Sequence, residues 1–228
     1  MRPVRNIIFD FGNVLFDLDL LSIGREIQRL VGDRYEHVRN RLQQLGVFEL
    51  YETGGISTEE FVDAIRFAGD ASLRTDQIIT AWNSIFIGMP RERFDMLLEL
   101  RQGYNVFLLS NINALHAAWI DAYLLREHGI SDFQARYFDG VYYSHLLRLR
   151  KPDRDIYEYV LADAELIPEE TVFIDDLEEN VATAQSLGIR GVLKTPEMDI
   201  MAWMKGFIGN PNQITPVQNP VQPSPFPG

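Results

Sequence analysis

The spacing of apolar residues divides the chain into two kinds of segment. Residues 18–88 carry apolar side chains at helical spacing, as at Phe61, Ile65 and Ala68, and contain no proline. The sequence STEE at 57–60 is typical of a helix N-terminus, where serine and acidic residues are common. We therefore predict that residues 18–88 form an all-helical block.

The rest of the chain alternates short apolar runs with helical stretches. Runs of this length and composition are typical of strands that are buried on both faces of a sheet. The alternation predicts an α/β fold with a doubly wound parallel sheet, in which the helical block is inserted after the first strand. The expected strands are residues 4–9, 105–109, 140–143, 171–174 and 191–193, and the expected helices between them are 90–102, 113–126, 153–164 and 178–187.

This organisation predicts a core of residues 1–17 and 89–205, the helical insertion 18–88 and a tail 206–228. The tail holds six of the eleven prolines and no ionisable side chain. Proline disfavours both helix and central strand, so we expect an extended surface tail or linker. Docking of the tail against the body or a neighbouring subunit is the alternative.

Composition narrows the class of protein. The 228 residues include 21 Lys and Arg against 33 Asp and Glu, a net charge of −12, which argues against non-specific nucleic-acid binding. The absence of cysteine excludes disulfides and thiolate metal sites. Neither a secretory signal nor a membrane-spanning segment is evident, so we expect a cytoplasmic protein with neither nucleic-acid nor membrane partners. Nothing in the sequence sets its oligomeric state.

Polar side chains follow the expected strands in a regular way. Ligands of open α/β sheets bind at the carboxyl ends of the strands, so these side chains should lie together. Singly, each has an ordinary explanation as a helix cap, a turn residue or a solvated surface residue. The set comprises Asp10 after the first strand, Ser110 and Asn111 after the second, Lys151 beyond the third, and Asp175 and Asp176 after the fourth, with Asn180 four residues on.

Three carboxylates at one edge of a sheet would repel one another. At about 4 Å and an effective dielectric constant of 20 the cost is roughly 4 kcal/mol per pair, which favours a bound proton or cation. Oxygen ligands without cysteine or a histidine pair select a hard ion such as Mg²⁺. With Lys151, the Ser110 hydroxyl and the Asn111 backbone NH, such an ion would bind a dianion. The pattern favours phosphoryl transfer, with a carboxylate that attacks phosphorus.

The set Asp10, Ser110, Lys151 and Asp175-Asp176 resembles the four motifs of the haloacid dehalogenase superfamily over about residues 4–205, with a helical cap after the first motif. The segments DFGNV, ETGGIS, AWNSIF, SNIN followed by His116, and RKPD are similar to those of the bacterial α-D-glucose-1-phosphate phosphatases in this superfamily.

The resemblance implies a role for each motif residue. Asp10 would be the nucleophile and a Mg²⁺ ligand, the Gly12 carbonyl a second ligand and Asp176 a direct ligand. Asp175 would bind or orient a water on the metal. The cap would close over the site and choose the leaving group. The transferred phosphoryl group would be held by Ser110 and Asn111 and bridged to the nucleophile by Lys151.

One position departs from the superfamily pattern. Most phosphatases there have a second Asp two residues after the nucleophile, as general acid and base, where this chain has Gly12. Such catalysis is typically worth 10²–10⁴-fold. Asp17 and Asp19 could reach back to replace it, or they are loop acids and helix caps. His116 could face the phosphate, or it is an ordinary helix histidine.

These observations favour a Mg²⁺-dependent phosphatase acting on a small phosphorylated metabolite, such as the sugar phosphate glucose 1-phosphate, through an aspartyl-phosphate on Asp10. A 2-haloacid dehalogenase needs no metal, so the Asp175-Asp176 pair argues against it. A sugar phosphomutase needs the acid that Gly12 lacks. A catalytically weakened phosphate-binding or regulatory protein is the alternative from a different class.

Overall fold

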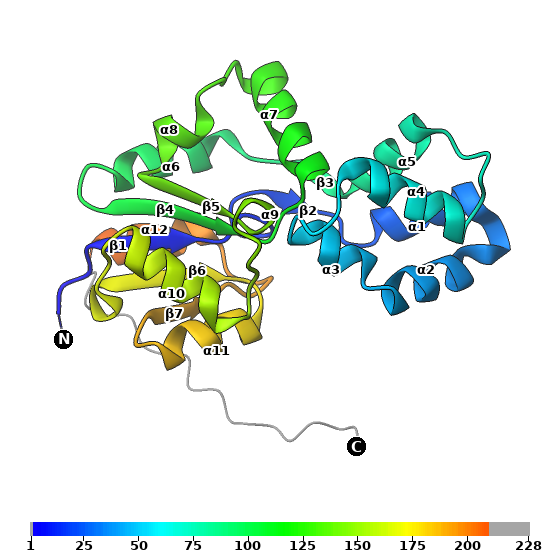
Figure 1. Ribbon diagram of the computed structural model, residues 1–228. Coiled ribbons are helices and arrows are strands. Elements are labelled where there is room, and N and C mark those ends of the chain that lie inside the picture. The colour runs from blue at the N-terminus through cyan, green and yellow to red at the C-terminus, as the bar shows by residue number, and fades with distance from the viewer. Residues whose placement is uncertain (1, 210–228) are drawn as a thin grey trace.

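The central sheet has five parallel strands in the order β5-β4-β1-β6-β7. The computed structural model describes residues 2–209 and shows this sheet between two layers of helices (Figure 1). The five expected strands are confirmed to within two residues at their ends, and so is the doubly wound α/β fold. The strands are β1 (Asn6–Phe9), β4 (Asn105–Ser110), β5 (Gly140–Tyr143), β6 (Thr171–Asp175) and β7 (Arg190–Leu193).

Successive strand residues face opposite sides of the sheet, so each face builds its own core. Ile7 and Phe9 of β1 belong to one apolar cluster, whereas Ile8 between them belongs to another. The first face is covered by α6 (Arg91–Leu100), α7 (Ala114–His128), α8 (Phe133–Tyr137) and α12 (Ile200–Gly209). The second face is covered by α10 (Arg154–Asp163) and α11 (Glu178–Ser186) (Figure 1), and the short α9 (Ser144–Leu147) and η3 (Pro168–Glu170) lie in connections.

The insertion between β1 and β4 forms a separate helical cap with its own apolar core. The expected helix start at Ser57 is confirmed, and it carries a capping box: Ser57 Oγ accepts from Glu60 N at 3.2 Å, and Glu60 Oε2 accepts from Ser57 N at 2.8 Å. The cap contains α1 (Ser22–Val31), η1 (Gly32–Arg34), α2 (Tyr35–Gln44), α3 (Val47–Glu52), α4 (Thr58–Ala68), α5 (Thr75–Trp82) and η2 (Asn83–Ile85).

Two segments differ from the expected boundaries. The insertion is not helical throughout, because β2 (Asp17–Leu18) and β3 (Phe86–Gly88) pair antiparallel where the chain leaves and re-enters the core. Helix α12 extends to Gly209, so the first four residues of the expected tail are helical. Proline does not occur there until position 211, which explains why the helix continues. The rest of the expected tail lies outside the described residues.

The end of α3 connects the cap to the core. The Leu115 backbone NH donates to the Tyr51 hydroxyl at 3.1 Å, and Ser144 Oγ donates to the Glu52 carbonyl at 2.7 Å. Gly54 follows with φ +65°, and a Cβ there would lie 2.2 Å from the carbonyl oxygen of His145. This turn can therefore lie against α9 only because it has no side chain.

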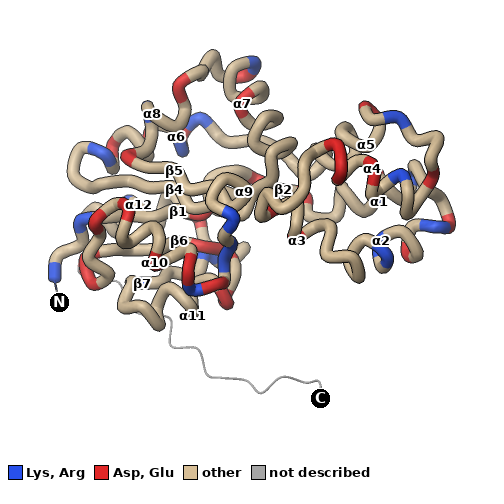
Figure 2. Tube along the Cα trace, in the orientation of Figure 1, with Lys and Arg blue, Asp and Glu red and all other residues tan. Residues whose placement is uncertain are grey.

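Charged residues lie mainly on helices and loops, whereas the traces of β4 and β5 carry none (Figure 2). Within residues 2–209 no helix is both long enough and apolar enough to cross a membrane.

We predict that Gly54→Ala lowers the free energy of unfolding more than Gly46→Ala does. Both glycines have positive φ, but nothing lies within 4 Å of a Cβ at Gly46. The control should lose only about 1–2 kcal/mol for left-handed backbone, and Gly54→Ala roughly 2 kcal/mol more because the turn must move off α9. Urea unfolding of both variants measures the difference. Equal losses would show that contact with α9 does not constrain the turn.

Candidate active site

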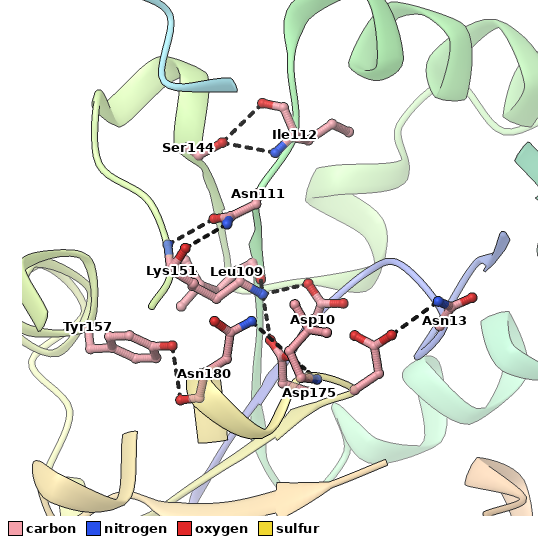
Figure 3. A network of polar contacts seen from close by, with 12 residues as sticks. Asp10, Asn13, Leu109, Asn111, Ile112, Ser144, Lys151, Tyr157, Asp175 and Asn180 are labelled. Carbon is pink, nitrogen blue, oxygen red and sulfur yellow. Dashed lines mark hydrogen bonds and ion pairs between the residues drawn. The ribbon is translucent and has the colours of Figure 1, made fainter. Parts of the chain in front are cut away.

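A buried ammonium group lies between two carboxylates at the carboxyl edge of the sheet (Figure 3). Lys151 Nζ lies 2.6 Å from Asp10 Oδ1 and 2.7 Å from Asp175 Oδ2. It also donates to the Leu109 carbonyl at 3.0 Å. The Lys151 side chain is only 2% exposed. Residues of three motifs from distant parts of the sequence thus meet at the edge where the sequence predicted a ligand site.

The sheet and one amide side chain hold this cluster in place. Asp10 continues β1, since its backbone NH donates to the Ile174 carbonyl at 2.9 Å, and Asp175 is the last residue of β6. The loop that carries Lys151 is held by Asn111, whose side chain donates to the Lys151 carbonyl at 2.8 Å and accepts from its NH at 2.9 Å. The Asn111 side chain therefore positions the lysine, which leaves the Asn111 backbone NH as its group for a phosphoryl contact.

The two neighbouring aspartates differ in their surroundings. Asp175 is fully buried, and besides Lys151 it accepts from the Leu177 NH at 2.8 Å and from Asn180 Nδ2 at 2.9 Å. Asp176 is half-buried and accepts from Asn13 Nδ2 at 3.1 Å. The oxygens of Asp175 are thus committed to protein donors, whereas Asp176 retains acceptor capacity. Asn180, a residue expected at the site, orients Asp175.

The charges in this cluster do not balance. Burial raises the pKa of Asp10 to about 7; Lys151 opposes this rise and Asp175 adds to it. Burial by itself would lower the pKa of Lys151, but Asp10 and Asp175 together raise it. Burial also raises the pKa of Asp176. One cation shared by three acids leaves a deficit of positive charge, which a further cation would relieve.

The open oxygen atoms fit a hard metal ion. Asp10 Oδ2 and the Gly12 carbonyl accept no hydrogen bond from residues 2–209, and Asp176 has spare acceptor capacity. Among these residues no three His, Cys, Asp or Glu side chains form a ready-made cage. Two carboxylates and one carbonyl suit Mg²⁺, which commonly keeps its remaining ligands as water and substrate oxygens.

A pocket of about 260 Å³ lies between core and cap beside the cluster. Its core wall includes Gly12, Ser110 and Asn111, and its cap wall includes Phe48 and Trp82. Ser110 is the last residue of β4, and it is buried where the strand meets the pocket. The pocket therefore joins the positions expected to bind a phosphoryl group to the cap that would select the leaving group.

The less central candidates lie in other environments. Asp17 pairs with Arg93 at 2.7 Å, and Asp19 pairs with Arg25 and accepts from the Leu21 NH. Neither aspartate lines the pocket. Asp17 is the first residue of β2, and Asp19 lies in the loop before α1.

His116 lines the pocket, but its ring nitrogens contact the Trp82 carbonyl at 3.1 Å and Asn113 Nδ2 at 3.2 Å. Burial lowers the pKa of His116 to about 4, so it is neutral at pH 7. Its ring therefore stacks on Trp82 as part of the wall and offers no cation to a phosphate.

Sequence reasoning missed two residues at the site. Asn13, which has φ +54°, donates a side-chain hydrogen bond to Asp176. A single asparagine in DFGNV did not indicate this role. Glu52 is the first residue of the ETGGIS segment and lines the pocket from the cap. The sequence indicated that segment by its resemblance alone, and the docking of α3 on the core is what brings Glu52 to the pocket.

The chain combines a doubly wound sheet, an Asp–Lys–Asp cluster at the carboxyl edge of that sheet and a helical cap. This combination defines a class of α/β enzymes with a buried carboxylate in the active site. The chain matches the haloacid dehalogenase-like hydrolase family over residues 4–188, and it belongs to that family. It is thus a hydrolase, as the motifs implied.

Similar proteins cover almost the whole chain. A D-ribitol-5-phosphate phosphatase of Bacteroides thetaiotaomicron is 29% identical over 81% of this chain and 89% of its own. A sesquiterpene phosphatase of Aspergillus oryzae is 28% identical over 89% of this chain and 95% of its own. The crystal structure of a family enzyme from B. thetaiotaomicron is 32% identical, with a TM-score of 0.82 over 89% of this chain and 99% of that chain. The same enzyme was also solved with magnesium and inorganic phosphate.

We predict opposite effects for substitutions at the two neighbouring aspartates. Asp175→Ala leaves Lys151 with one carboxylate and removes the acceptor for Leu177 and Asn180, so the free energy of unfolding should fall by roughly 3–5 kcal/mol. Asp176→Ala should change it by less than about 1 kcal/mol but weaken Mg²⁺ binding more. Urea unfolding and a Mg²⁺ titration of both variants measure this. Stronger loss of metal affinity in Asp175→Ala than in Asp176→Ala, at equal stability, would reverse the assignment.

Proposed function

We propose that the protein is a Mg²⁺-dependent phosphatase that forms an aspartyl-phosphate on Asp10. The observation that carries this proposal is the shared contact of Lys151 with Asp10 and Asp175, which leaves Asp10 Oδ2 open. The charge deficit and the oxygen donors support a divalent cation held by Asp10, Asp176 and the Gly12 carbonyl. The magnesium and phosphate complex of a related enzyme supports the same assignment.

The residues divide the work of phosphoryl transfer. The Asp10 carboxylate attacks phosphorus through one oxygen as the bond to the leaving oxygen breaks, and water then attacks phosphorus to break the Asp10–phosphorus bond, which releases phosphate and restores Asp10. Lys151 holds Asp10 in position and offsets charge, while Ser110 and the Asn111 NH bind the phosphoryl oxygens. When bound, Mg²⁺ would neutralise charge on the phosphoryl oxygens.

For the substrate we propose a small phosphorylated sugar or polyol, such as glucose 1-phosphate. A pocket of about 260 Å³ suits a single sugar. The segments that resemble glucose-1-phosphate phosphatases support this class, and so does the similarity to a D-ribitol-5-phosphate phosphatase.

A second candidate substrate is a phosphate ester of a larger apolar alcohol. The cap contains a second, largely apolar cavity of about 540 Å³, and it shares Ile23, Phe48 and Trp82 with the site pocket. An apolar chain could therefore extend from the site into the cap. The similarity to a sesquiterpene phosphatase supports this alternative.

The two non-phosphatase alternatives make different demands on the site. A dehalogenase would need no cation, so that function would not explain why Asp175 and Asp176 lie beside Asp10 with too little positive charge to balance them. The L-2-haloacid dehalogenase of Xanthobacter autotrophicus, at 18% identity and a TM-score of 0.54, shares the fold. A phosphate-binding protein would bind phosphate without turnover.

We predict that Asp10→Asn abolishes phosphate release while the protein stays folded. The amide keeps the shape of the side chain but removes the attacking carboxylate, so less than about 1% of activity should remain. The assay measures phosphate released from glucose 1-phosphate, ribitol 5-phosphate, p-nitrophenyl phosphate and farnesyl phosphate, with Mg²⁺ and with EDTA. Release that survives EDTA would contradict the metal, and substantial activity in Asp10→Asn would contradict the nucleophile. The ester that releases phosphate fastest shows whether the substrate is a sugar phosphate or the phosphate of an apolar alcohol.

We also predict that Mg²⁺ stabilises the protein more at pH 8 than at pH 5.5. Since the pKa of Asp10 is raised to about 7, the group is protonated at pH 5.5 and must lose its proton to bind a cation. At pH 8 a hundredfold excess of Mg²⁺ over Kd should contribute about 2.7 kcal/mol. Melting temperatures with Mg²⁺, with Na⁺ at equal ionic strength and with EDTA measure this. An equal shift at both pH values would show that Asp10 does not bind the ion.

A further inference from the structure

The phosphatase chemistry proposed above lacks a group that transfers a proton. Gly12 stands where an acid would follow the nucleophile, and a Cβ there would lie 2.7 Å from Leu18 Cδ1. The Leu18 side chain thus occupies the space of the missing acid, and Leu18 itself lines the pocket. Two side chains on the pocket wall can titrate, His116 and Glu52. His116 is neutral at pH 7 and both its nitrogens have protein partners, which leaves Glu52.

Glu52 is held in the pocket by the core rather than by the cap alone. Its carbonyl accepts from Ser144 Oγ at 2.7 Å, and the preceding residue, Tyr51, accepts from the Leu115 NH. The turn after it lies against α9 through Gly54. The backbone at Glu52 is therefore fixed to the core, and the residue lines the pocket.

The charged groups around Glu52 come from both domains. Arg150 Nη2 lies 3.2 Å from Glu52 Oε2, and Arg150 Nη1 lies 3.6 Å from Glu49 Oε1. Burial raises the pKa of the Glu52 carboxyl; Arg150 and Lys151 oppose the rise and Glu49 adds to it. The net rise increases the protonated fraction near neutral pH, which is the state that a general acid needs. Because the charge of Lys151 lowers the pKa of this carboxyl, Glu52 lies close enough to interact electrostatically with the lysine that contacts Asp10.

We propose that Glu52 is the general acid and base of the phosphatase reaction. In the first step the Glu52 carboxyl gives its proton to the leaving oxygen as the P–O bond breaks and Asp10 bonds to phosphorus. In the second step the Glu52 carboxylate takes a proton from the water that attacks phosphorus, which releases phosphate and restores both groups. The proton balance closes without another reactant. The proposal depends on the phosphatase function, and it assigns to the cap the role that Gly12 cannot fill.

The test is a leaving-group series with the variant Glu52→Gln. The substrates are p-nitrophenyl, phenyl and benzyl phosphate, which have no hydroxyl groups and leave with oxygens of increasing basicity. The matched control is Glu49→Gln, because Glu49 also pairs with Arg150 but its side chain is 66% exposed and lies outside the pocket. Melting temperatures of all variants verify the fold, and Glu52→Asp, which keeps the acid but withdraws it, serves if the glutamine variant does not fold.

In Glu52→Gln we expect kcat/KM for benzyl phosphate to fall by about 100-fold or more, with a loss below about 3-fold for p-nitrophenyl phosphate. A burst of nitrophenol should also appear, because the aspartyl-phosphate loses its general base. In Glu52→Asp the losses should be smaller but follow the same order, and Glu49→Gln should resemble the wild type.

An equal loss for all three esters, or no loss, would overturn the proposal, since a packing role does not depend on the leaving group. Losses confined to hydroxylated esters such as glucose 1-phosphate would assign Glu52 to substrate recognition and likewise overturn it. If the wild type releases phosphate from none of the esters, the phosphatase function itself fails and Glu52 has no such role. Turnover by the wild type with an unaffected Glu52→Gln variant overturns the proposal for Glu52 alone.

Discussion

The contact of one buried ammonium group with two carboxylates organises the rest of this protein. Lys151 lies between Asp10 and Asp175, and removal of one partner from such a buried set typically costs 3–5 kcal/mol. Strands β1 and β6 position the two acids, and the Asn111 amide at the end of β4 fixes the lysine loop. The sheet order β4-β1-β6 is therefore what brings the three charges together. Because the charge of Lys151 alone cannot balance Asp10, Asp175 and Asp176, the fold favours the binding of a second cation.

The core and the cap carry different parts of the proposed reaction. The core holds the nucleophile, the oxygen donors for a metal and the phosphoryl contacts. The cap covers the leaving group with aromatic side chains and, in our proposal, supplies the proton through Glu52. The end of α3 joins the two parts, since Gly54 allows close contact with α9 and Ser144 binds the Glu52 carbonyl. A change in cap residues could thus alter the substrate without disturbing the phosphoryl site.

The fold and the central cluster could be predicted from the sequence because their signals are local. Each strand is a short apolar run, and Asp10, Lys151 and Asp175 follow strands at positions that a parallel sheet brings to one edge. Other features depend on packing between distant segments. The position of Glu52 requires the docking of α3 on the core, and the side-chain role of Asn111 requires the path of the Lys151 loop. The β2–β3 pair was missed because strands of two and three residues leave no periodic pattern.

Chemical trapping of a covalent intermediate would show whether Asp10 is the nucleophile. Protein mixed with Mg²⁺ and p-nitrophenyl phosphate is quenched with borohydride, which reduces an aspartyl-phosphate to homoserine, and the site is mapped by mass spectrometry. We expect homoserine at position 10, dependent on both substrate and Mg²⁺. Turnover without modification at Asp10, or modification of another carboxylate, would contradict it.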